Sequence, residues 1–597
     1  FFAGEGSKQG DTLGPLLFAI GAIAKLKQVS ERCPTVRLVA ILDDVGIVGR
    51  PADVTHATVL LKNLLQADGF ELQSEKSAFL WPHTDAQVPA ILQDAANQLG
   101  WRVETGAMVV LGVPVGLGAA RNRLITQHAG KIAQRHERFF DTVAHEKMPS
   151  QTAMLLLQSS AAPRMNYLTR CLPPTCFEVF QRFDARVEQT VRFVAQLPPL
   201  EANSPASHQL CLPVSLGGLG IRRTEAVSPA AYWSAVHSYA PAIRPIIEKR
   251  LQEMEEADIP LFQRLEQLHA ALIGQGVRPA PGVFPEQPQE SLEFYGQAAP
   301  PQLQAAIFKQ IEAAIAVSVY SRSSPADKAR LSSLRLPHSG TWLRVCPTSV
   351  ISKLSNLQFS IAVKQRLGIN LVNPLPAVCP CCEGDASLRE DATHLLGCPN
   401  LSRTALTRRH DAIVTHLAAW CNSVKMPAFV EPKINGQRRR PDVDIILNQG
   451  RVLVDVSFVH PSSATYVRHH NAMTSAVSPL HAREQVKTSK YGRLAQEAQA
   501  ELVPFVVSSF GGFGGSAMRF FAKLREAVAS MDPVPWSSDP VGDLVRDLCV
   551  IAQRGNASAV IMGCNRAGIL LRHQRPVGLV AEAEAQPADE HPELVDV

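Results

Sequence analysis

Two pairs of aspartates in this chain have the residue type and spacing that binding of a divalent cation requires. Asp43 and Asp44 are adjacent in the stretch LVAILDDVGIVG, where two short apolar runs predict two strands joined by a turn. Two carboxylates so close together repel each other unless a cation neutralises them. Aspartate is also a common turn residue, so this pair alone does not establish a metal site.

The second pair is Asp442 and Asp455, in the stretch PDVDIILNQGRVLVDVSF. Asp442 precedes a strand predicted over 443–447, and Asp455 lies in a second strand predicted over 452–458. Antiparallel strands joined by a short turn bring the two acids to the same end of a sheet. There they could hold a metal ion that activates water for hydrolysis. The alternative is two strand-end acids in an unrelated α/β domain.

A cluster of cysteines and one histidine lies in CPCCEGDASLREDATHLLGC. Its spacing suits a tetrahedral zinc ion held by three thiolates and one imidazole. The predicted ligands are Cys379, Cys382, His394 and Cys398, and Cys381 is a spare that could replace one of the first two. The alternative is a chance group of buried cysteines.

Composition limits the classes to which the chain can belong. It has 597 residues, enough for about four domains, and 46% are hydrophobic while 19% are charged, which argues against wholesale disorder. Most of its 12 cysteines are scattered, so no disulfide framework is indicated. No apolar run reaches the ~20 residues of a membrane span. The net charge of +5 is compatible with a nucleic-acid partner but does not demonstrate one.

Hydrophobic periodicity predicts the elements around the first acid pair. Residues 13–26 are apolar on nearly all sides and predict a buried helix, and 55–68 predict an amphipathic helix. Residues 108–115 predict one strand. Further along, 121–195 and 201–370 have mostly helical patterns.

Four motifs accompany the first acid pair. GSKQGDTLGPLLF precedes it, and GFELQSEKS, LGVPVG and SSAAPRMNYLTRCLPP follow it in that order. Together with the Asp-Asp hairpin, they resemble the palm and thumb of non-LTR retrotransposon reverse transcriptases. The resemblance implies that Asp43 and Asp44 bind Mg²⁺ or Mn²⁺. It also implies that Gln9 and Gly10 lie near the incoming nucleotide and template. Lys76 would donate a proton to the leaving pyrophosphate.

The sequence departs from that family in two ways. Ile41 stands two residues before Asp43, where the family usually has an aromatic residue. The first catalytic aspartate of the palm and the fingers lie upstream of the Gln-Gly motif, before the first residue given. We therefore expect the chain to be the C-terminal portion of a longer polyprotein, with an incomplete polymerase.

The later motifs resemble the same elements. The Cys/His cluster is similar to their CCHC zinc knuckle, and the spacing of Asp442 and Asp455 is similar to that of their restriction-like endonuclease. Such nucleases usually carry a lysine two residues after the second acid, where this chain has Ser457. Lys487 and Lys490, in EQVKTSKYG, are candidate replacements, and we prefer Lys490 because it stands beside Tyr491. The alternative for both lysines is an exposed helix face.

Three basic clusters surround the second acid pair in the sequence. They are Arg438, Arg439 and Arg440; Arg408, Arg409 and His410; and Arg468, His469 and His470. A basic run is often only a solvated surface. Three clusters near one acid pair nevertheless predict a rim that binds a phosphate backbone without specifying its sequence.

These features predict a multidomain α/β chain. Its segments are a partial reverse transcriptase palm (1–120), a helical thumb (121–200), a mostly helical linker with a Pro-rich loop at 278–301 (201–370), a zinc knuckle (371–400), a PD-(D/E)xK-type restriction-like endonuclease (401–530) and an extension with an acidic, disordered tail (531–597).

The implied function is target-primed reverse transcription, in which the nuclease nicks DNA and the polymerase copies the element's RNA from the nick. We expect Mg²⁺ or Mn²⁺ and Zn²⁺ as cofactors. The expected partners are the DNA target, the RNA template and the N-terminal part of the same polyprotein, in the nucleus and without a membrane. The alternatives are an inactive or domesticated nucleic-acid-binding remnant, or a nuclease that keeps the palm only as a scaffold.

Overall fold

The structure is a computed structural model, and it separates the chain into two units, Phe1–Arg135 and His136–Val597. The residues that it describes are 12–173, 177–239, 242, 245, 260–287, 302–371, 378–379, 382, 393–396, 398, 403–434, 440–531, 534–566 and 571. Gln9, Gly10, Cys381, Arg438, Arg439 and the predicted acidic tail lie outside these residues. None of the described helices combines the length and apolar composition needed to cross a bilayer.

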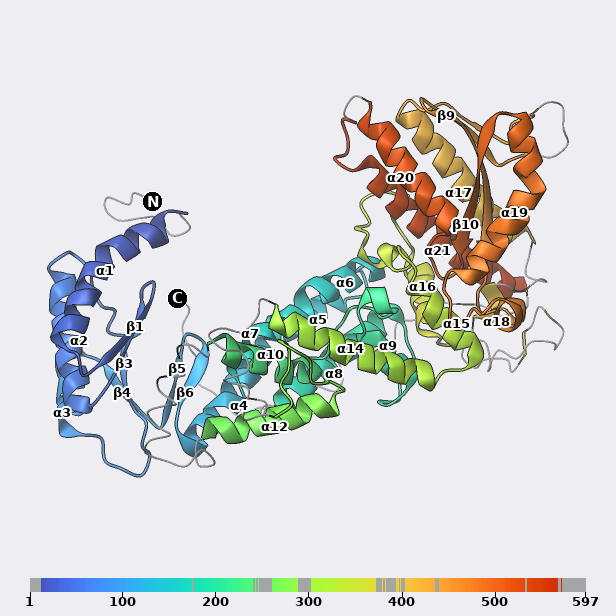
Figure 1. The fold of residues 1–597 in the computed structure, drawn as a ribbon. Coiled ribbons are helices and arrows are strands. Elements are labelled where there is room, and N and C mark those ends of the chain that lie inside the picture. Colours follow the sequence, from blue (N-terminus) through green and yellow to red (C-terminus); the bar gives the residue numbers. More distant parts are fainter. Residues whose placement is uncertain are drawn as a thin grey trace. The chain divides into compact units, whose positions relative to one another are not determined.

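Within residues 12–135, the first unit contains three two-stranded sheets and four helices. Its elements are α1 (Gly14–Arg32), β1 (Arg37–Ile41), β2 (Asp44–Val48), α2 (Pro51–Gln66), β3 (Ala78–Trp81), α3 (Ala90–Leu99), β4 (Arg102–Thr105), β5 (Ala107–Val110), β6 (Val113–Gly116) and α4 (Gly118–Arg135). Figure 1 shows α1 and α2 beside the β1–β2 hairpin. Val29 from α1 and Leu61 from α2 are buried in the core that joins these elements.

The hairpin around the first acid pair is confirmed, because β1 and β2 pair antiparallel and Ile41 lies opposite Asp44. The single strand predicted over 108–115 is wrong. It is instead a second hairpin, β5–β6, whose turn residues Leu111 and Gly112 have positive φ angles of 51° and 73°. Two consecutive residues with positive φ angles form a tight turn between antiparallel strands. Val109, Val110, Leu111 and Val113 surround the turn, and this apolar run obscures the turn signal of Gly112.

The helix predicted to be buried is only partly so. One face of α1 packs against α2, but Leu16, Leu17, Ile20 and Ile23 on another face are 51–62% exposed. An all-round apolar pattern predicts burial only where every face of the helix meets another element. Among the described residues, the first unit covers one face and leaves the other open.

The N-terminal part of the second unit is helical, as predicted. Its helices are α5 (Glu137–Val143), α6 (Ser150–Leu156), α7 (Asn166–Cys171), α8 (Phe177–Ala195), α9 (Pro205–Cys211), α10 (Thr224–Ser238), α12 (Pro260–Gly274), α14 (Leu303–Ser321), α15 (Pro325–Ser333) and α16 (Asn356–Leu367). Trp233 and Phe284 are fully buried in one of its cores. Asp184 of α8 caps α10 by accepting the backbone N–H groups of Thr224 and Glu225.

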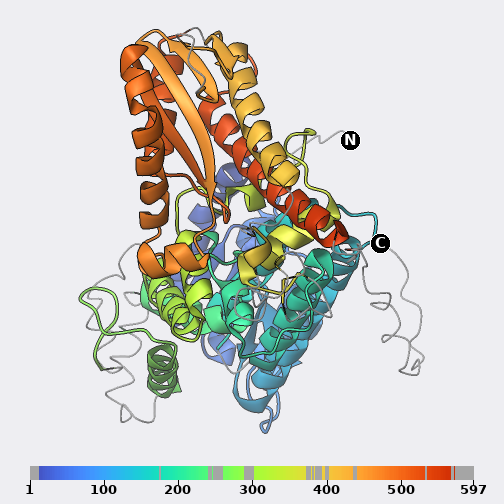
Figure 2. The same cartoon turned by 90° about the vertical axis from the view of Figure 1, so that its right-hand side faces the viewer.

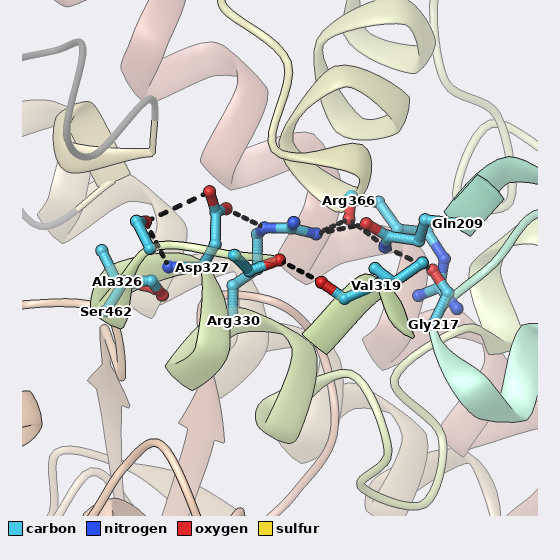
Figure 3. Close-up of polar contacts among 10 residues, drawn as sticks. Gln209, Gly217, Val319, Ala326, Asp327, Arg330, Arg366 and Ser462 are labelled. Carbon is cyan, nitrogen blue, oxygen red and sulfur yellow. Dashed lines mark hydrogen bonds and ion pairs between the residues drawn. The ribbon is translucent and has the colours of Figure 1, made fainter. Parts of the chain in front are cut away.

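A buried polar network joins several of these helices (Figure 3). Arg366 donates to the backbone oxygens of Val214 and Gly218, and Arg330 donates to the Asp327 carboxylate and to Gln209. Because buried guanidinium groups are costly without partners, these contacts fix how the helices pack. The close packing here requires a glycine at 218 in the GGLG stretch, since a Cβ on Gly218 would lie 2.5 Å from the Gln209 carbonyl oxygen.

The C-terminal part of the second unit is a four-stranded sheet of order β10-β9-β8-β7. The strands are β7 (Ala428–Val430), β8 (Val443–Leu447), β9 (Gly450–Val459) and β10 (Ala500–Ser508), and the helices are α17 (Arg403–Ser423), α18 (Ala464–His469), α19 (Ser478–Glu497), α20 (Gly515–Ala529) and α21 (Pro540–Arg566). β7, β8 and β9 are antiparallel, whereas β9 and β10 are parallel. The β8 strand and the β8–β9 pairing agree with the prediction.

Helices cover both faces of this sheet. On one face, Tyr491 and Leu494 of α19 pack on Leu453 of β9. On the other, Phe505 of β10 contacts α20, and Phe458 of β9 lies against α17. Figure 1 shows α19 on the opposite side of the strands from α17 and α20.

Residues 540–566 were predicted to belong to an extension beyond the sheet domain, but they form α21. This helix runs alongside α17 (Figures 1 and 2). Cys564 of α21, Ile361 of α16 and Ala405 of α17 share one core with the predicted zinc ligands. In the described residues, the zinc ligands therefore share one core with α16, α17 and α21.

Candidate active site and metal centre

The second acid pair lies across two neighbouring strands. Val443 is the register partner of Val454, so Asp442 stands opposite Asp455. The Asp442 backbone N–H donates to the Val454 carbonyl at 3.0 Å, and the Asp442 Oδ2 atom accepts the Val456 N–H at 2.6 Å. The two acids are close enough for the charge of Asp442 to act on Asp455.

Lys487 of α19 meets this pair from the helix that covers its face. Its Nζ atom lies 2.6 Å from Oδ2 of Asp455. Asp455 is only 1% exposed and the Lys487 side chain 12%, so both charges are largely removed from solvent. A buried carboxylate needs such a partner, because desolvation penalises its ionised form.

The electrostatics of Asp455 favour the arrival of a further cation. Burial is the main reason that the pKa of Asp455 is raised; the hydrogen bond from Lys487 opposes this shift, and the nearby Asp442 charge adds to it. Burial and the neighbouring Asp455 charge raise the pKa of Tyr491 to about 12, so its hydroxyl stays protonated. Two neighbouring carboxylates that are largely shielded from solvent supply the hard oxygen ligands that Mg²⁺ and Mn²⁺ prefer.

Lys490, the lysine we preferred from the sequence, lies elsewhere. Its side chain is exposed, with Nζ 4.6 Å from the centroid of the Tyr491 ring. The two lysines are three residues apart on α19, and Lys487 is in contact with Asp455. This contact favours Lys487 for the site.

His410 is a residue of this site whose role the sequence did not reveal. Its Nε2 atom lies 3.0 Å from Oδ2 of Asp442, and its Nδ1 atom lies 3.0 Å from Oδ1 of Asp411. The hydrogen bond to Asp442 is the main reason that the pKa of His410 is raised to about 9. Its only signal in the sequence was membership of a basic cluster.

The structure describes the basic rim only in part. One residue that was predicted to belong to it, Arg409, is buried instead. Arg408 and Arg440 are exposed, as surface binding requires. Arg409 is only 6% exposed, and its guanidinium carbon lies 3.9 Å from the centroid of the Phe458 ring. It donates to Asn556 Oδ1 at 2.6 Å, and burial lowers its pKa to about 10. Arg409 thus holds α17 to the sheet and to α21 and cannot contact DNA.

The four predicted zinc ligands converge. The Cys382 Sγ atom lies 3.2 Å from Cys398 Sγ and 3.3 Å from His394 Nε2, and Cys379 Sγ lies 3.9 Å from Cys398 Sγ. A tetrahedral zinc ion with bonds of about 2.0–2.3 Å separates its ligand atoms by roughly 3.3–3.8 Å. The donor atoms therefore fit zinc. All four lie within 4.8 Å of one another, and the three cysteines are buried.

The first acid pair has a different setting. Asp43 and Asp44 are exposed at the β1–β2 turn, after Leu42 with its positive φ of 54°. Within the described residues, neither carboxylate forms an ion pair or a side-chain hydrogen bond. Lys76 is exposed in another turn, where its backbone N–H donates to the Gln73 carbonyl. The described unit thus brings two acids together without a third ligand.

A mixed helix and sheet fold with a Cys₃His cluster and a lysine-paired acid site is compatible with a multidomain α/β protein. No protein-family model matches the chain. It is 22% identical over 564 residues to the retrotransposable element SLACS 132 kDa protein of Trypanosoma brucei gambiense, an alignment that covers 92% of this chain. The chain spans only 39% of that relative's length. This distant similarity over most of the chain supports a retrotransposon-derived protein.

Proposed function

We propose that the chain is part of a retrotransposon protein and that its C-terminal sheet domain is a metal-dependent DNA-nicking endonuclease. The observation that carries the proposal is the opposition of Asp442 and Asp455 across β8 and β9, with Lys487 at 2.6 Å from Asp455. Two acids and a lysine that meet on neighbouring inner strands of a sheet suit a metal-dependent hydrolytic site. The similarity to the SLACS protein supports a role in an element that inserts into DNA.

The residues divide the work of phosphodiester hydrolysis. Asp442 and Asp455 would hold a divalent cation, which supplies a water of lowered pKa and polarises the scissile phosphate. Lys487 lies where its ammonium group can orient that water and offset the charge that develops on phosphorus-bound oxygens. Arg408 and Arg440 are exposed and available to a phosphate backbone.

The first unit belongs, in this proposal, to the palm of an RNA-directed DNA polymerase. The confirmed hairpin that presents Asp43 and Asp44 at its turn supports this assignment. Because the described residues place two acids at this turn and a two-metal polymerase site needs a third, synthesis requires a further ligand. Together the two units fit target-primed reverse transcription, with a DNA target and an RNA template as partners.

Nicking of supercoiled plasmid by the full chain in Mg²⁺ or Mn²⁺ tests the nuclease. A shorter protein that ends near residue 530 is unsuitable, because α21 completes the core around α17 and the zinc ligands. We expect Asp455→Asn to abolish nicking while DNA binding persists, since that change removes one metal-binding charge. Failure of the parent to nick in either metal would refute the proposal.

A further inference from the structure

His410 reaches the acid pair from the opposite side to Lys487. It lies on α17, which packs on the face of the sheet that α19 does not cover. Asp442 precedes the first residue of β8, so its carboxylate stands at the end of the strand and is accessible from both faces. The neighbouring Arg409 is buried under Phe458, and this contact fixes the helical turn that carries His410.

Both hydrogen bonds to the Asp442 carboxylate fall on the same oxygen. Oδ2 accepts the Val456 N–H at 2.6 Å and faces His410 Nε2 at 3.0 Å. Two donors from different elements restrain the rotation of the carboxylate about its side-chain torsions. Each carboxylate oxygen has two lone pairs, and neither donor uses those of Oδ1. The arrangement therefore fixes Oδ2 and leaves the lone pairs of Oδ1 available to a metal ion.

The imidazole is itself held from behind. Its Nδ1 atom faces Oδ1 of Asp411, the next residue of α17, at 3.0 Å. A chain of polar contacts therefore links the Asp411 carboxylate, the His410 imidazole and the Asp442 carboxylate. It leads from a partly exposed face of α17 to the acid pair. Ligands of metal ions are commonly oriented by such outer hydrogen bonds, whose loss typically costs about 10–100-fold in metal affinity or activity.

We propose that His410 is a positioning residue of the nuclease, which holds Oδ2 of Asp442 so that this carboxylate is oriented for a divalent cation. Asp411 serves the same purpose one step further out, by fixing the orientation of the ring. This inference rests on the proposed nuclease function, because it assigns Asp442 to the metal. His410 contacts neither DNA nor the attacking water in this role.

Two substitutions separate the hydrogen bond from the presence of the ring. His410→Gln places an amide N–H near the position of Nε2, whereas His410→Asn places one near Nδ1 and leaves Asp442 without this donor. His410→Ala removes both donors. Circular dichroism and zinc content of each full-length variant establish that the fold is retained before any comparison.

The measurement is Mn²⁺ binding to the full, zinc-loaded chain, followed by the electron paramagnetic resonance signal of free Mn²⁺. Binding that the Asp442→Asn protein retains is subtracted. We expect His410→Ala and His410→Asn to bind Mn²⁺ about 10–100-fold more weakly, and His410→Gln to stay close to the parent. In nicking assays, the Mn²⁺ concentration for half-maximal rate should rise by the same factor, with a smaller change in the rate at saturating Mn²⁺.

Three results would overturn the inference. They are parent-like Mn²⁺ affinity of His410→Ala, equal weakness of the Gln and Asn variants, and a parent that binds no more Mn²⁺ than Asp442→Asn. A parent that nicks DNA while His410→Ala matches it in both assays removes the inference and leaves the nuclease standing. A parent that binds Mn²⁺ at Asp442 but never nicks removes the proposed function.

Discussion

The two units differ in how completely each builds the surroundings of its acid pair. Asp43 and Asp44 are neighbours in the chain, exposed at a hairpin turn beside a helix with an open apolar face. Asp442 and Asp455 are brought together by strand register and are met by Lys487 and His410 from two helices. The first pair is an arrangement of local sequence, whereas the second is a product of tertiary structure.

The difference shows what makes an acid pair chemically useful. Repulsion between carboxylates is weakened by the high dielectric constant of water at an exposed turn. In a dry site the same repulsion must be offset by cations, and the fold supplies them here from α17 and α19. The C-terminal unit therefore contains the more complete site, and the following predictions test that contrast.

The largest expected effect concerns zinc, because the Cys₃His cluster that the described residues form lies in the second unit. Structural zinc contributes about 10–16 kcal/mol of apparent binding free energy in small motifs. Cys398 is fully buried in the core shared by α16, α17 and α21. We expect Cys398→Ser to lose the metal and to abolish the thermal transition of the second unit in calorimetry, while the first unit is unaffected.

The exposed Cys346 lies outside the cluster and provides the matched control. Cys346→Ser should retain one zinc per chain by atomic absorption and melt like the parent. Full zinc retention by a protein that carries both Cys382→Ala and His394→Ala would show that the cluster is not a zinc site.

The next effect distinguishes the two lysines of α19. Lys487→Met should lower the nicking rate by about 10²–10⁴-fold, the range that positioned proton-handling groups contribute. Lys490→Met should leave the rate near that of the parent, because the Lys490 side chain is exposed and its ammonium group lies over the Tyr491 ring. Single-turnover nicking at saturating Mg²⁺ makes the comparison, and the opposite ranking would restore the preference drawn from the sequence.

A smaller effect should appear in the pH dependence of stability. The pKa of His410 is raised from 6.5 to about 9, chiefly by its hydrogen bond to Asp442. A raised pKa in the folded state adds stability that is fully present below pH 6.5 and is lost as the pH rises through about 9. Asp442→Asn removes the main cause of the shift.

Urea unfolding of the zinc-loaded protein, without added Mg²⁺ or Mn²⁺, measures this effect. Between pH 6.5 and 9, the parent should lose more stability than the Asp442→Asn protein. Parallel pH profiles would mean that the contact between His410 and Asp442 does not persist in solution.

The smallest effect concerns the basic rim. Arg440→Ala should weaken DNA binding and lower the salt slope by about 1, because it removes one exposed phosphate contact. Arg409→Ala should instead destabilise the second unit, since this buried side chain packs on Phe458 and bonds Asn556. Fluorescence anisotropy across a salt series, together with melting curves, separates the two outcomes. If Arg409→Ala changed the salt slope and Arg440→Ala did not, the burial of Arg409 would be contradicted.

Local patterns in the sequence identified much of this site. Alternation and the turn at 448–450 predicted β8 and its antiparallel partner, and the spacing of Cys379 to Cys398 predicted four converging ligands. These features depend on short-range geometry. The β5–β6 hairpin was missed because its turn uses Leu111 at positive φ, which the residue type does not announce.

The remaining features depend on packing between distant segments. Arg409 is buried because α21 supplies its partner Asn556, 147 residues later. Gly555 leaves room for this packing, since a Cβ there would lie 2.5 Å from the Arg409 Cγ atom. The choice between Lys487 and Lys490 depends on how α19 is rotated over β9. No local pattern fixes that rotation, and the same is true of the contact between His410 and Asp442.

The most direct test of the account compares the two acid pairs in one assay. The full chain, its Asp455→Asn variant and a variant with both Asp43→Asn and Asp44→Asn are incubated with supercoiled plasmid and Mg²⁺ or Mn²⁺. We expect the parent and the Asp43/Asp44 variant to nick at similar rates, and Asp455→Asn not to nick although it still binds DNA. Nicking by Asp455→Asn at the parental rate would contradict the claim that the C-terminal pair is the hydrolytic site.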